Sequence, residues 1–509
     1  MGVFLSFYST KRIRKEYIIA FFFSFLFGLM VHLFKLTNYL PNHDSMYNFY
    51  SDQNMIASGR WFLSIVCGFS SFFDLPWING LFALFFISLT SVFFVKIFQV
   101  NKPIVICIIS ALMVTFPAIT ESFCFEFTAD GYMFAMLLAS LAAYFQIRQG
   151  RSFFQIAVSS LLLCFSCGIY QAYISFYIVL IICWYIWIVF TEDFSNKVYL
   201  RYIVNGFISL VLGLLLYYCI WKVCMFFQGV TPTDYQGIDN LQFLIFSNPL
   251  LVIKNAVIAL ITFVFEKNVF KYGITPYAIF NCIFIFSSLF IFFISCKKAK
   301  IIKNRFKLIS VIMCILLLPS SICFWQMVSA SVFYSYRMLQ SIFVLYGFAI
   351  VLCDRYVNNA FSNVFVILVS GMIINLSVLA NIAYNYLNYE YECSYAEANR
   401  LVYAIEEFKR EHKEVSKVAL VGNREKEVAL DQNSEANGAF IFTNMIEKSL
   451  LLDSVHTENF LKNVLYYDAD FADYNERQII ENSREYAQME SWFDGGSIEI
   501  INNIITIKL

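Results

Sequence analysis

Residues 41–61, "PNHDSMYNFYSDQNMIASGRW", place Asp44, Asp52 and Arg60 directly after a long apolar run. A carboxylate at the end of a membrane span meets both lipid headgroups and water. It can act as a general base if partial burial among aromatic rings raises its pKa toward neutrality. Asp44 is the first candidate for that role. The alternatives are a solvated loop residue or the cap of a helix that begins at Ser45.

A second group of carboxylates lies in "ESFCFEFTADGY", residues 121–132. Glu126 and Asp130 are four residues apart, so on a helix they share one face. Two carboxylates on one face can divide acid and base roles, bind a metal ion or raise each other's pKa. Three carboxylates between two apolar runs are costly unless they are hydrated or used. Simple solvation in a loop is the alternative.

Cationic and amide side chains also lie at the ends of apolar runs. Arg337 lies in "SVFYSYRMLQ" (331–340), where its guanidinium could grip a phosphate through two hydrogen bonds. The alternative is an arginine that reaches ordinary lipid headgroups. Gln171 in "CGIYQAY" (167–173) could bond a sugar hydroxyl or pack between helices. Arg60, Lys222 and Lys254 are weaker cations of the same kind.

The composition defines the class of protein that carries these residues. Of 509 residues, 60% are hydrophobic and 14% are charged, against roughly 25% charged in soluble domains. Apolar runs near the ~20 residues that span a bilayer recur from Tyr17 to Tyr384. They predict a polytopic α-helical membrane protein. The net charge of zero gives no reason to expect a nucleic-acid partner. The fourteen cysteines, mostly within apolar runs, indicate buried small hydrophobes rather than a disulfide or zinc framework.

The charges between the runs predict the topology. We expect about eleven spans, at residues 17–36, 77–98, 103–120, 131–147, 153–170, 172–190, 202–224, 276–295, 308–325, 338–353 and 361–383. The basic N-terminal segment reads as a retained signal anchor. Both it and the Lys- and Arg-rich residues 296–307 are expected in the cytoplasm. An odd number of spans then places the tail outside, in the periplasm of a bacterial inner membrane.

Two domains follow from this pattern. Residues 1–384 form the membrane domain, and its outer segments 37–76, 121–130, 225–275 and 326–337 concentrate the carboxylates and aromatics. Residues 385–509 form a small soluble α/β domain. Within the outer segments, 60–73 is expected along the membrane interface and 250–274 as a re-entrant or interfacial helix.

The tail domain has its own local signals. A helix is expected over 391–415, with Ser394 and Glu397 as a capping box. Strands are expected at 417–423 and 497–509. The domain could recognise a substrate chain or cover the active site.

The stretches "HDSMYNFYSDQNMIASGRWFL", "FDLPWINGLFALFFISL" and "FEFTADGYMFAMLLASLAAY" resemble the type II Gtr family of O-antigen glucosyltransferases. The resemblance extends over most of the chain, to the closing "GGSIEIINNIITIKL". It implies a GT-C type membrane glycosyltransferase. Such enzymes move glucose from polyprenyl-phosphate-glucose to lipid-linked O-antigen at the periplasmic face, which converts the serotype. They work beside a donor flippase and a cytoplasmic enzyme that makes the donor.

The resemblance also implies roles for individual residues. Asp44 matches the acidic residue of the first outer loop that serves as the catalytic base, with Asp52 as the fallback and Asp130 as a further catalytic carboxylate. The residues expected to bind substrate are Arg60, Asp52, Glu126, Gln171, Tyr336 and Arg337. Arg337 would stabilise the phosphate as it leaves. No cofactor is required, although the three carboxylates at 121–130 could hold a divalent metal ion.

Other functions fit the same sequence. A transferase of another lipid-phosphate-linked sugar, or an O-antigen polymerase, would differ only in the shape of its pocket. A flippase or transporter would be expected to show repeated halves and polar residues midway through its spans, and neither is evident. A purely structural scaffold would leave the clustered carboxylates unexplained.

Overall fold

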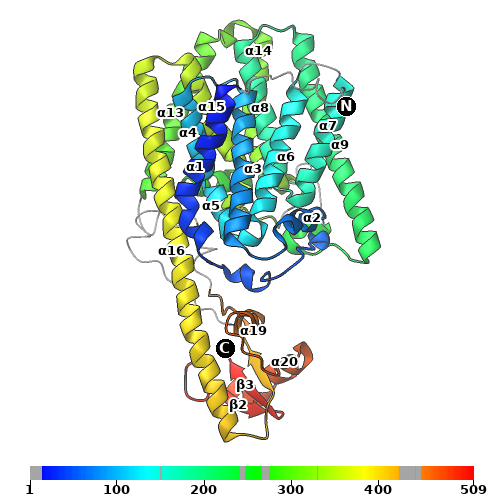
Figure 1. The fold of residues 1–509 in the computed structure, drawn as a ribbon. Coiled ribbons are helices and arrows are strands. Elements are labelled where there is room, and N and C mark those ends of the chain that lie inside the picture. Colours follow the sequence, from blue (N-terminus) through cyan, green and yellow to red (C-terminus); the bar gives the residue numbers. More distant parts are fainter. Residues whose placement is uncertain are drawn as a thin grey trace, which may run out of the picture.

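The computed structural model describes residues 14–148, 152–240, 247–265, 274–329, 331–423, 442 and 449–509. It consists of a helical bundle and a smaller C-terminal α/β unit (Figure 1). Helix α16 (Asn359–Glu411) runs along one side of the bundle and continues into the C-terminal unit. We call the end of the bundle that faces this unit the tail-side end.

The bundle begins with α1 (Lys15–Thr37) and α3 (Pro76–Ile97), then the shorter α4 (Pro103–Thr115) and α5 (Pro117–Cys124). It continues with α6 (Glu126–Ile147), α7 (Ser152–Ile169), α8 (Tyr173–Thr191), α9 (Asn196–Gln228) and α11 (Pro249–Phe265). Helices α13 (Pro276–Lys298), α14 (Arg305–Ile322) and α15 (Ser341–Tyr356) precede α16. In this bundle α1 packs on α3 and α4, α3 on α6, α6 on α7, and α7 on α9.

Eight helices within the described ranges are long and apolar enough to cross a membrane, and α4 with α5 would make a ninth. The chain is therefore a membrane protein with many helices. Each of the eleven predicted spans falls on a helix or on the bent pair α4–α5. Helices α7 and α15 are shorter than the others, so the count of eleven stays a prediction.

Residues 121–130 differ from the expected outer loop. They are helical on both sides of Phe125 and buried within the bundle. The axis bends by 41° between α4 and α5, because Pro117 disfavours the helical conformation at Phe116. A second break at Phe125 separates α5 from α6. These two bends let a helical segment carry Glu121 and Glu126 inside the bundle.

Short elements connect the long helices at the tail-side end. They are η1 (His43–Met46), η2 (Ile56–Ser58), α2 (Leu63–Cys67), η3 (Gly68–Ser70), η4 (Tyr235–Asn240), η6 (Phe324–Met327) and η7 (Tyr336–Met338). Segment 60–73 contains the short helix α2 and, directly after it, η3, so it is helical over residues 63–70 and too short to span; its place at the membrane interface stays a prediction. Helix α11 covers most of segment 250–274, whose residues 266–273 lie outside the described ranges.

The C-terminal unit contains the expected strands. Strand β3 (Ile504–Lys508) lies between β1 (Val418–Val421), which runs parallel to it, and β2 (Ile498–Ile501), which runs antiparallel. Helices α19 (Ser454–Asn463), α20 (Tyr474–Glu481) and α21 (Arg484–Gln488) complete the unit. The expected capping box at Ser394 is wrong, because α16 begins 35 residues earlier, at Asn359. The Ser394 hydroxyl instead donates to Glu390, one turn back, at 2.8 Å.

Candidate active site

Arg60 is held at the tail-side end by a tight turn. The turn closes with a bridge between Met55 and Arg60, and Gly59 adopts a left-handed conformation with φ of 81°. The Tyr217 hydroxyl donates to the Gly59 carbonyl at 3.0 Å. A Cβ at position 59 would lie 2.4 Å from that hydroxyl oxygen and 2.5 Å from Nε2 of Gln171. Glycine is therefore required here, both for the backbone conformation and for the close approach of α9.

The Arg60 side chain lies against two stacked tyrosines. Its Nη1 donates to the Tyr132 hydroxyl at 3.3 Å, and its guanidinium carbon lies 5.0 Å from the centre of the Tyr170 ring. The rings of Tyr132 and Tyr170 are stacked, with 4.5 Å between their centres. The buried Nε of Arg60 has no hydrogen-bond partner among the residues that the structure describes. This guanidinium is thus fixed by aromatic contacts and retains a donor for another group.

Arg337 lies in turn η7, which directly precedes α15 in the chain. Its guanidinium carbon lies 3.7 Å above the Phe125 ring, and its Nε is also buried without a partner. The backbone N–H of Arg337 donates to the carboxylate of buried Glu121. Glu121 therefore fixes turn η7, from which Arg337 projects, without forming an ion pair with the guanidinium itself.

The two arginines lie near the same aromatic groups. Burial and the neighbouring Arg337 act to lower the pKa of Arg60, but Tyr132 and Tyr170 outweigh them and raise it. Burial likewise acts to lower the pKa of Arg337, and Tyr170 and Glu121 raise it overall. Both groups stay protonated. In the described part of the chain, neither guanidinium forms an ion pair with a carboxylate. Two cations with unused donors are a chemistry that can bind an anion such as phosphate.

A cavity of about 270 Å³ opens beside Arg60. Aromatic and aliphatic side chains together make up most of its lining, and Gln171, Gln236 and Ser329 add polar atoms. The aromatic lining residues are Tyr170, Tyr217, Tyr218, Trp221, Tyr235, Phe324 and Trp325. The indole N–H of Trp325 donates to the Gln171 carbonyl at 3.1 Å, which ties η6 to the start of α8. Such a cavity suits a ligand with an apolar chain or a sugar ring next to its anionic group.

Two of the predicted substrate-binding residues support the walls of this site. Gln171 donates from Nε2 to the Ser58 carbonyl at 2.7 Å and lines the cavity. Tyr336 donates to the Thr262 carbonyl of α11 at 3.2 Å, and its ring lies 5.5 Å from that of Phe263. Both therefore hold elements together around the arginines.

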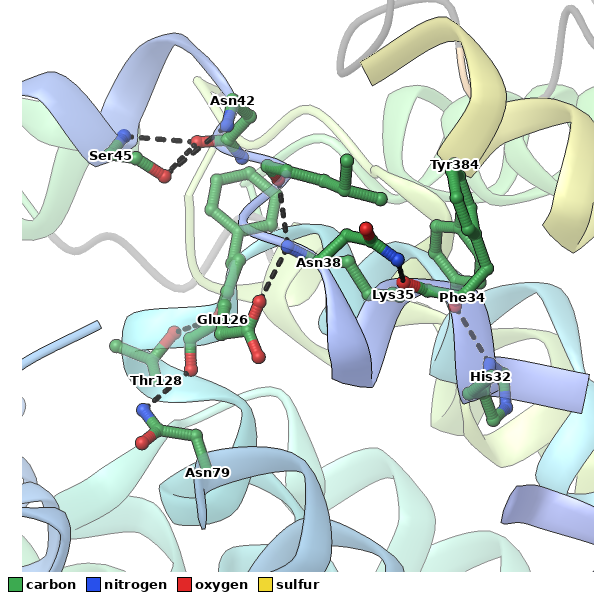
Figure 2. Close-up of polar contacts among 12 residues, drawn as sticks. His32, Phe34, Lys35, Asn38, Asn42, Ser45, Asn79, Glu126, Thr128 and Tyr384 are labelled. Atoms are coloured by element: carbon green, nitrogen blue, oxygen red, sulfur yellow. Dashed lines mark hydrogen bonds and ion pairs between the residues drawn. The ribbon is translucent and has the colours of Figure 1, made fainter. Parts of the chain in front are cut away.

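A buried ion pair underlies the first loop (Figure 2). Nζ of Lys35 lies 2.5 Å from Oε2 of Glu126 and donates to the Leu40 carbonyl at 2.7 Å. The Asn79 side chain donates to the Glu126 carbonyl at 3.1 Å. Lys35 and Glu126 are almost fully buried. Glu126 thus joins α6 to α1 and has the contacts of a structural residue.

Two further buried carboxylates, those of Asp130 and Asp74, lie near the first loop. Asp130 accepts from the Ser70 hydroxyl and from the Gly131 N–H, each at 2.8 Å. Asp74, in the segment before α3, has a buried Oδ1 without a hydrogen-bond partner. Burial raises the pKa of Asp74 to about 6, although Lys35 and Ser45 act to lower it. Within the described ranges, no three His, Cys, Asp or Glu side chains are placed to hold a metal ion.

Asp44 lies in turn η1, where its backbone is fixed and its carboxylate is accessible. The Asp44 carbonyl accepts from the Tyr47 N–H at 3.2 Å and from the Asn48 side chain at 2.8 Å. Its carboxylate is 44% exposed and lies 3.3 Å from Nε2 of His43. Asp52 is exposed and accepts from the Asn54 N–H at 3.0 Å. Neither carboxylate lines the cavity beside Arg60.

The structure brings together some of the predicted residues and separates others. Arg60 and Gln171 line one cavity, and Tyr336 and Arg337 lie in turn η7, whose Met338 lines it too. Asp130 instead contacts Ser70, and Glu126 contacts Lys35. Sequence reasoning missed Tyr132, Tyr170, Trp221, Trp325, Lys35 and Asp74. Lys35 carried a readable signal, because a lysine inside an apolar run requires a partner. The aromatic residues could not be singled out from the sequence, because aromatic residues are common throughout it.

The sequence of this chain matches the model of one known protein family. The model of the family "Glucosyl transferase GtrII" matches residues 33–353, well over half of the chain. The chain belongs to the GtrII glucosyl transferase family. The match includes Arg60 and Arg337 and most of the bundle, and it confirms the resemblance seen in the sequence. No curated protein and no solved structure matches the chain. Membership in the GtrII family implies a glycosyltransferase.

Proposed function

We propose that this GtrII protein transfers glucose from polyprenyl-phosphate-glucose to lipid-linked O-antigen at the periplasmic face of the inner membrane. The observation that carries the proposal is the pair of arginines whose Nε donors are unused among the described residues: Arg60 lines the apolar cavity, and Arg337 lies next to the lining residue Met338. A lipid-phosphate sugar presents an anion, a sugar ring and an apolar chain, and the site offers a complement to each. O-antigen as the acceptor is inferred from the family.

The reaction requires a base and a stabilised leaving group. A carboxylate takes the proton from the acceptor hydroxyl as its oxygen bonds to C1 of glucose. The bond from C1 to the phosphate oxygen breaks, and the electron pair leaves with the polyprenyl phosphate. Charge on that phosphate increases in the transition state, so Arg60 and Arg337 stabilise the transition state more than the ground state.

The base in this proposal comes from the first loop. Asp44 is the first choice, because its turn is fixed while its carboxylate stays accessible. Asp52 is the fallback. It lies in the loop whose Asn54 side chain donates to Gln228 at the end of α9, the helix that lines the cavity.

The orientation of the protein is also part of the proposal. Lys96, Lys102, Arg148 and the basic segment 296–307 lie at the ends of helices opposite the C-terminal unit. Positive residues favour the cytoplasmic side. The tail-side end then faces the periplasm, where the donor lipid would enter from the outer leaflet.

Transfer from a defined donor tests this function. Membranes that contain the protein would receive radiolabelled polyprenyl-phosphate-glucose and O-antigen lipid, without ATP or an ion gradient. We expect labelled O-antigen, and a loss of about 10²–10⁴-fold in Asp44→Asn if Asp44 is the base. UDP-glucose as the sole donor should give no product in washed membranes.

The same assay separates the alternatives. Full activity in Asp44→Asn with loss in Asp52→Asn would move the base to Asp52. Transfer from a different polyprenyl-phosphate sugar would change the donor while retaining the reaction class. Absence of transfer in open vesicles, together with donor movement across sealed ones, would indicate a flippase and contradict the proposal.

A further inference from the structure

The first loop enters the hydrophobic core of the C-terminal unit. Met46, two residues after Asp44, is 2% exposed. It belongs to the same buried cluster as Ala398 and Leu401 of α16 and Phe460 of α19. A residue from the membrane half of the chain thus completes a core whose other members all come from residue 398 onward.

The neighbouring Tyr47 makes specific contacts with α19. Its hydroxyl donates to Oδ2 of Asp453 at 3.4 Å. Its ring meets the His456 ring edge to face, with 4.3 Å between the ring centres. Asp453 is itself fixed, because its Oδ1 accepts from the N–H groups of Val455 and His456 and lies 2.8 Å from Nδ1 of His456. The partner surface of Tyr47 is therefore rigid.

The loop is held from the bundle side as well. Asn42 and Ser45 form a reciprocal capping box at the start of turn η1. Before the turn, the ring of Tyr39 packs edge to face on Tyr391 of α16, with 5.9 Å between the ring centres. The Asp44 carboxylate, which lies 3.3 Å from Nε2 of His43, is 44% exposed. A fixed backbone around an accessible carboxylate is what a general base requires.

We propose that the C-terminal unit positions the catalytic loop, with Met46, Tyr47 and His456 acting on Asp44 through the backbone of turn η1. This inference rests on the proposed function, since it assigns Asp44 the role of base. It gives the C-terminal unit a part in the chemical step rather than in donor binding. The arginine pair lies on other elements. Donor affinity should therefore not depend on the contacts between turn η1 and the C-terminal unit.

The test uses full-length protein in lipid nanodiscs, with three variants. Met46→Ala removes the side chain from the core, Met46→Leu retains its volume, and His456→Ala removes the partner ring of Tyr47. Tyr466→Ala is the control, because Tyr466 is 89% exposed on the same unit. Hydrogen exchange of residues 42–50, donor affinity, kcat and acceptor KM are measured for each.

We expect Met46→Ala and His456→Ala to speed exchange in residues 42–50 and to lower kcat by about 10–10²-fold, as for a misplaced catalytic group. Donor affinity should stay within about twofold of wild type, because the arginine pair is unchanged. Met46→Leu should restore most of kcat, and Tyr466→Ala should match wild type.

Several results would contradict the proposal that the C-terminal unit positions turn η1 for catalysis. Unchanged exchange in Met46→Ala would show that the C-terminal unit does not hold the loop. Faster exchange with unchanged kcat would show that the hold has no catalytic consequence. Equal loss of donor affinity and kcat would indicate a general loss of structure. If wild type transfers no sugar, the proposed function fails, and exchange alone still decides whether the unit holds the loop.

Discussion

At the scale of single residues, the arginine pair differs from the other buried charges of this protein. Lys35 forms an ion pair with Glu126, whereas the guanidinium groups of Arg60 and Arg337 contact aromatic rings, the Tyr132 hydroxyl and Met55 Sδ, and Glu121 acts on Arg337 without an ion-pair contact. A buried cation without an ion-pair partner costs free energy. The cost is offset when an anionic ligand binds, so the pair is better suited to binding than to stability.

Replacing Arg337 tests the phosphate role. We expect Arg337→Ala to lower kcat by about 10²–10³-fold, the loss typical of one transition-state donor. Arg337→Lys should recover only part of this loss, because an ammonium group cannot make the two parallel bonds of a guanidinium. Arg355→Ala is a matched control, since Arg355 ends α15 at the opposite end of the bundle. Equal rates in Arg337→Ala and wild type would remove Arg337 from the site.

Asp74 predicts a dependence of stability on pH. Its pKa is about 6 in the folded protein and near 3.8 when exposed, mainly because of burial. The folded state therefore binds this proton more tightly than the unfolded state does. Its contribution to stability is complete below the lower value and is lost as the pH rises through about 6.

Thermal unfolding in detergent at about pH 5 and about pH 7.5 would measure this contribution. The Tm of wild type should fall more between the two conditions than that of Asp74→Asn, which cannot ionise. Identical falls in both proteins would mean that Asp74 does not titrate in this range.

At the scale of elements, the breaks at Phe116 and Phe125 matter most. They place the polar residues of segment 121–130 inside the bundle, where Glu121 and Glu126 fix η7 and α1. The sequence predicted an outer segment here, with carboxylates that are either used in function or simply hydrated. The partners that make it a buried one lie elsewhere in the chain: Lys35 is 91 residues from Glu126, and Arg337 is 216 residues from Glu121. Local sequence patterns do not reveal such pairs.

Removing one member of the buried pair tests its structural role. Glu126→Gln leaves Lys35 without a charged partner and should destabilise the bundle by about 3–5 kcal/mol. Lys35→Met combined with Glu126→Gln should recover part of that loss, since no unpaired charge remains. Thermal unfolding in detergent compares these variants with Glu192→Gln, whose side chain is exposed. A Glu126→Gln protein as stable as wild type would show that this pair does not hold α1 to α6.

At the scale of the whole molecule, the apolar periodicity predicted most of the architecture. Helix α3 begins and ends within one residue of the expected span. Its run of about 20 apolar residues has the length that a helix needs to cross the bilayer, so the run marks both ends of the helix. Strands formed within both predicted segments: β1 lies in 417–423, and β2 and β3 lie in 497–509. The proximity of Arg60 and Arg337, 277 residues apart, could not be predicted, because it depends on how the helices pack. The chemical roles of the site residues stay predictions.

The orientation can be checked through Cys393, which is exposed on α16 beyond the apolar part of that helix. A small membrane-impermeant maleimide should label wild type in intact spheroplasts, and Cys393→Ser should lose that labelling. Lys300→Cys, introduced into the Cys393→Ser protein, places a cysteine in the basic segment between α13 and α14 and should react only after permeabilisation. The reverse pattern would place the C-terminal unit in the cytoplasm.

Helix α16 is continuous from the bilayer to the C-terminal unit. A change in the tilt of its membrane part therefore also moves the part that lies in the C-terminal unit. Its 53 residues correspond to about 80 Å, of which roughly half lies beyond the hydrocarbon region. A change of about 10° in its tilt would displace the far end sideways by about 7 Å. Because α16 packs on α19, and α19 packs on the turn that carries Asp44, such a tilt would also move this turn. If Asp44 is the base, as proposed, we expect the rate of transfer to depend on the thickness of the surrounding bilayer.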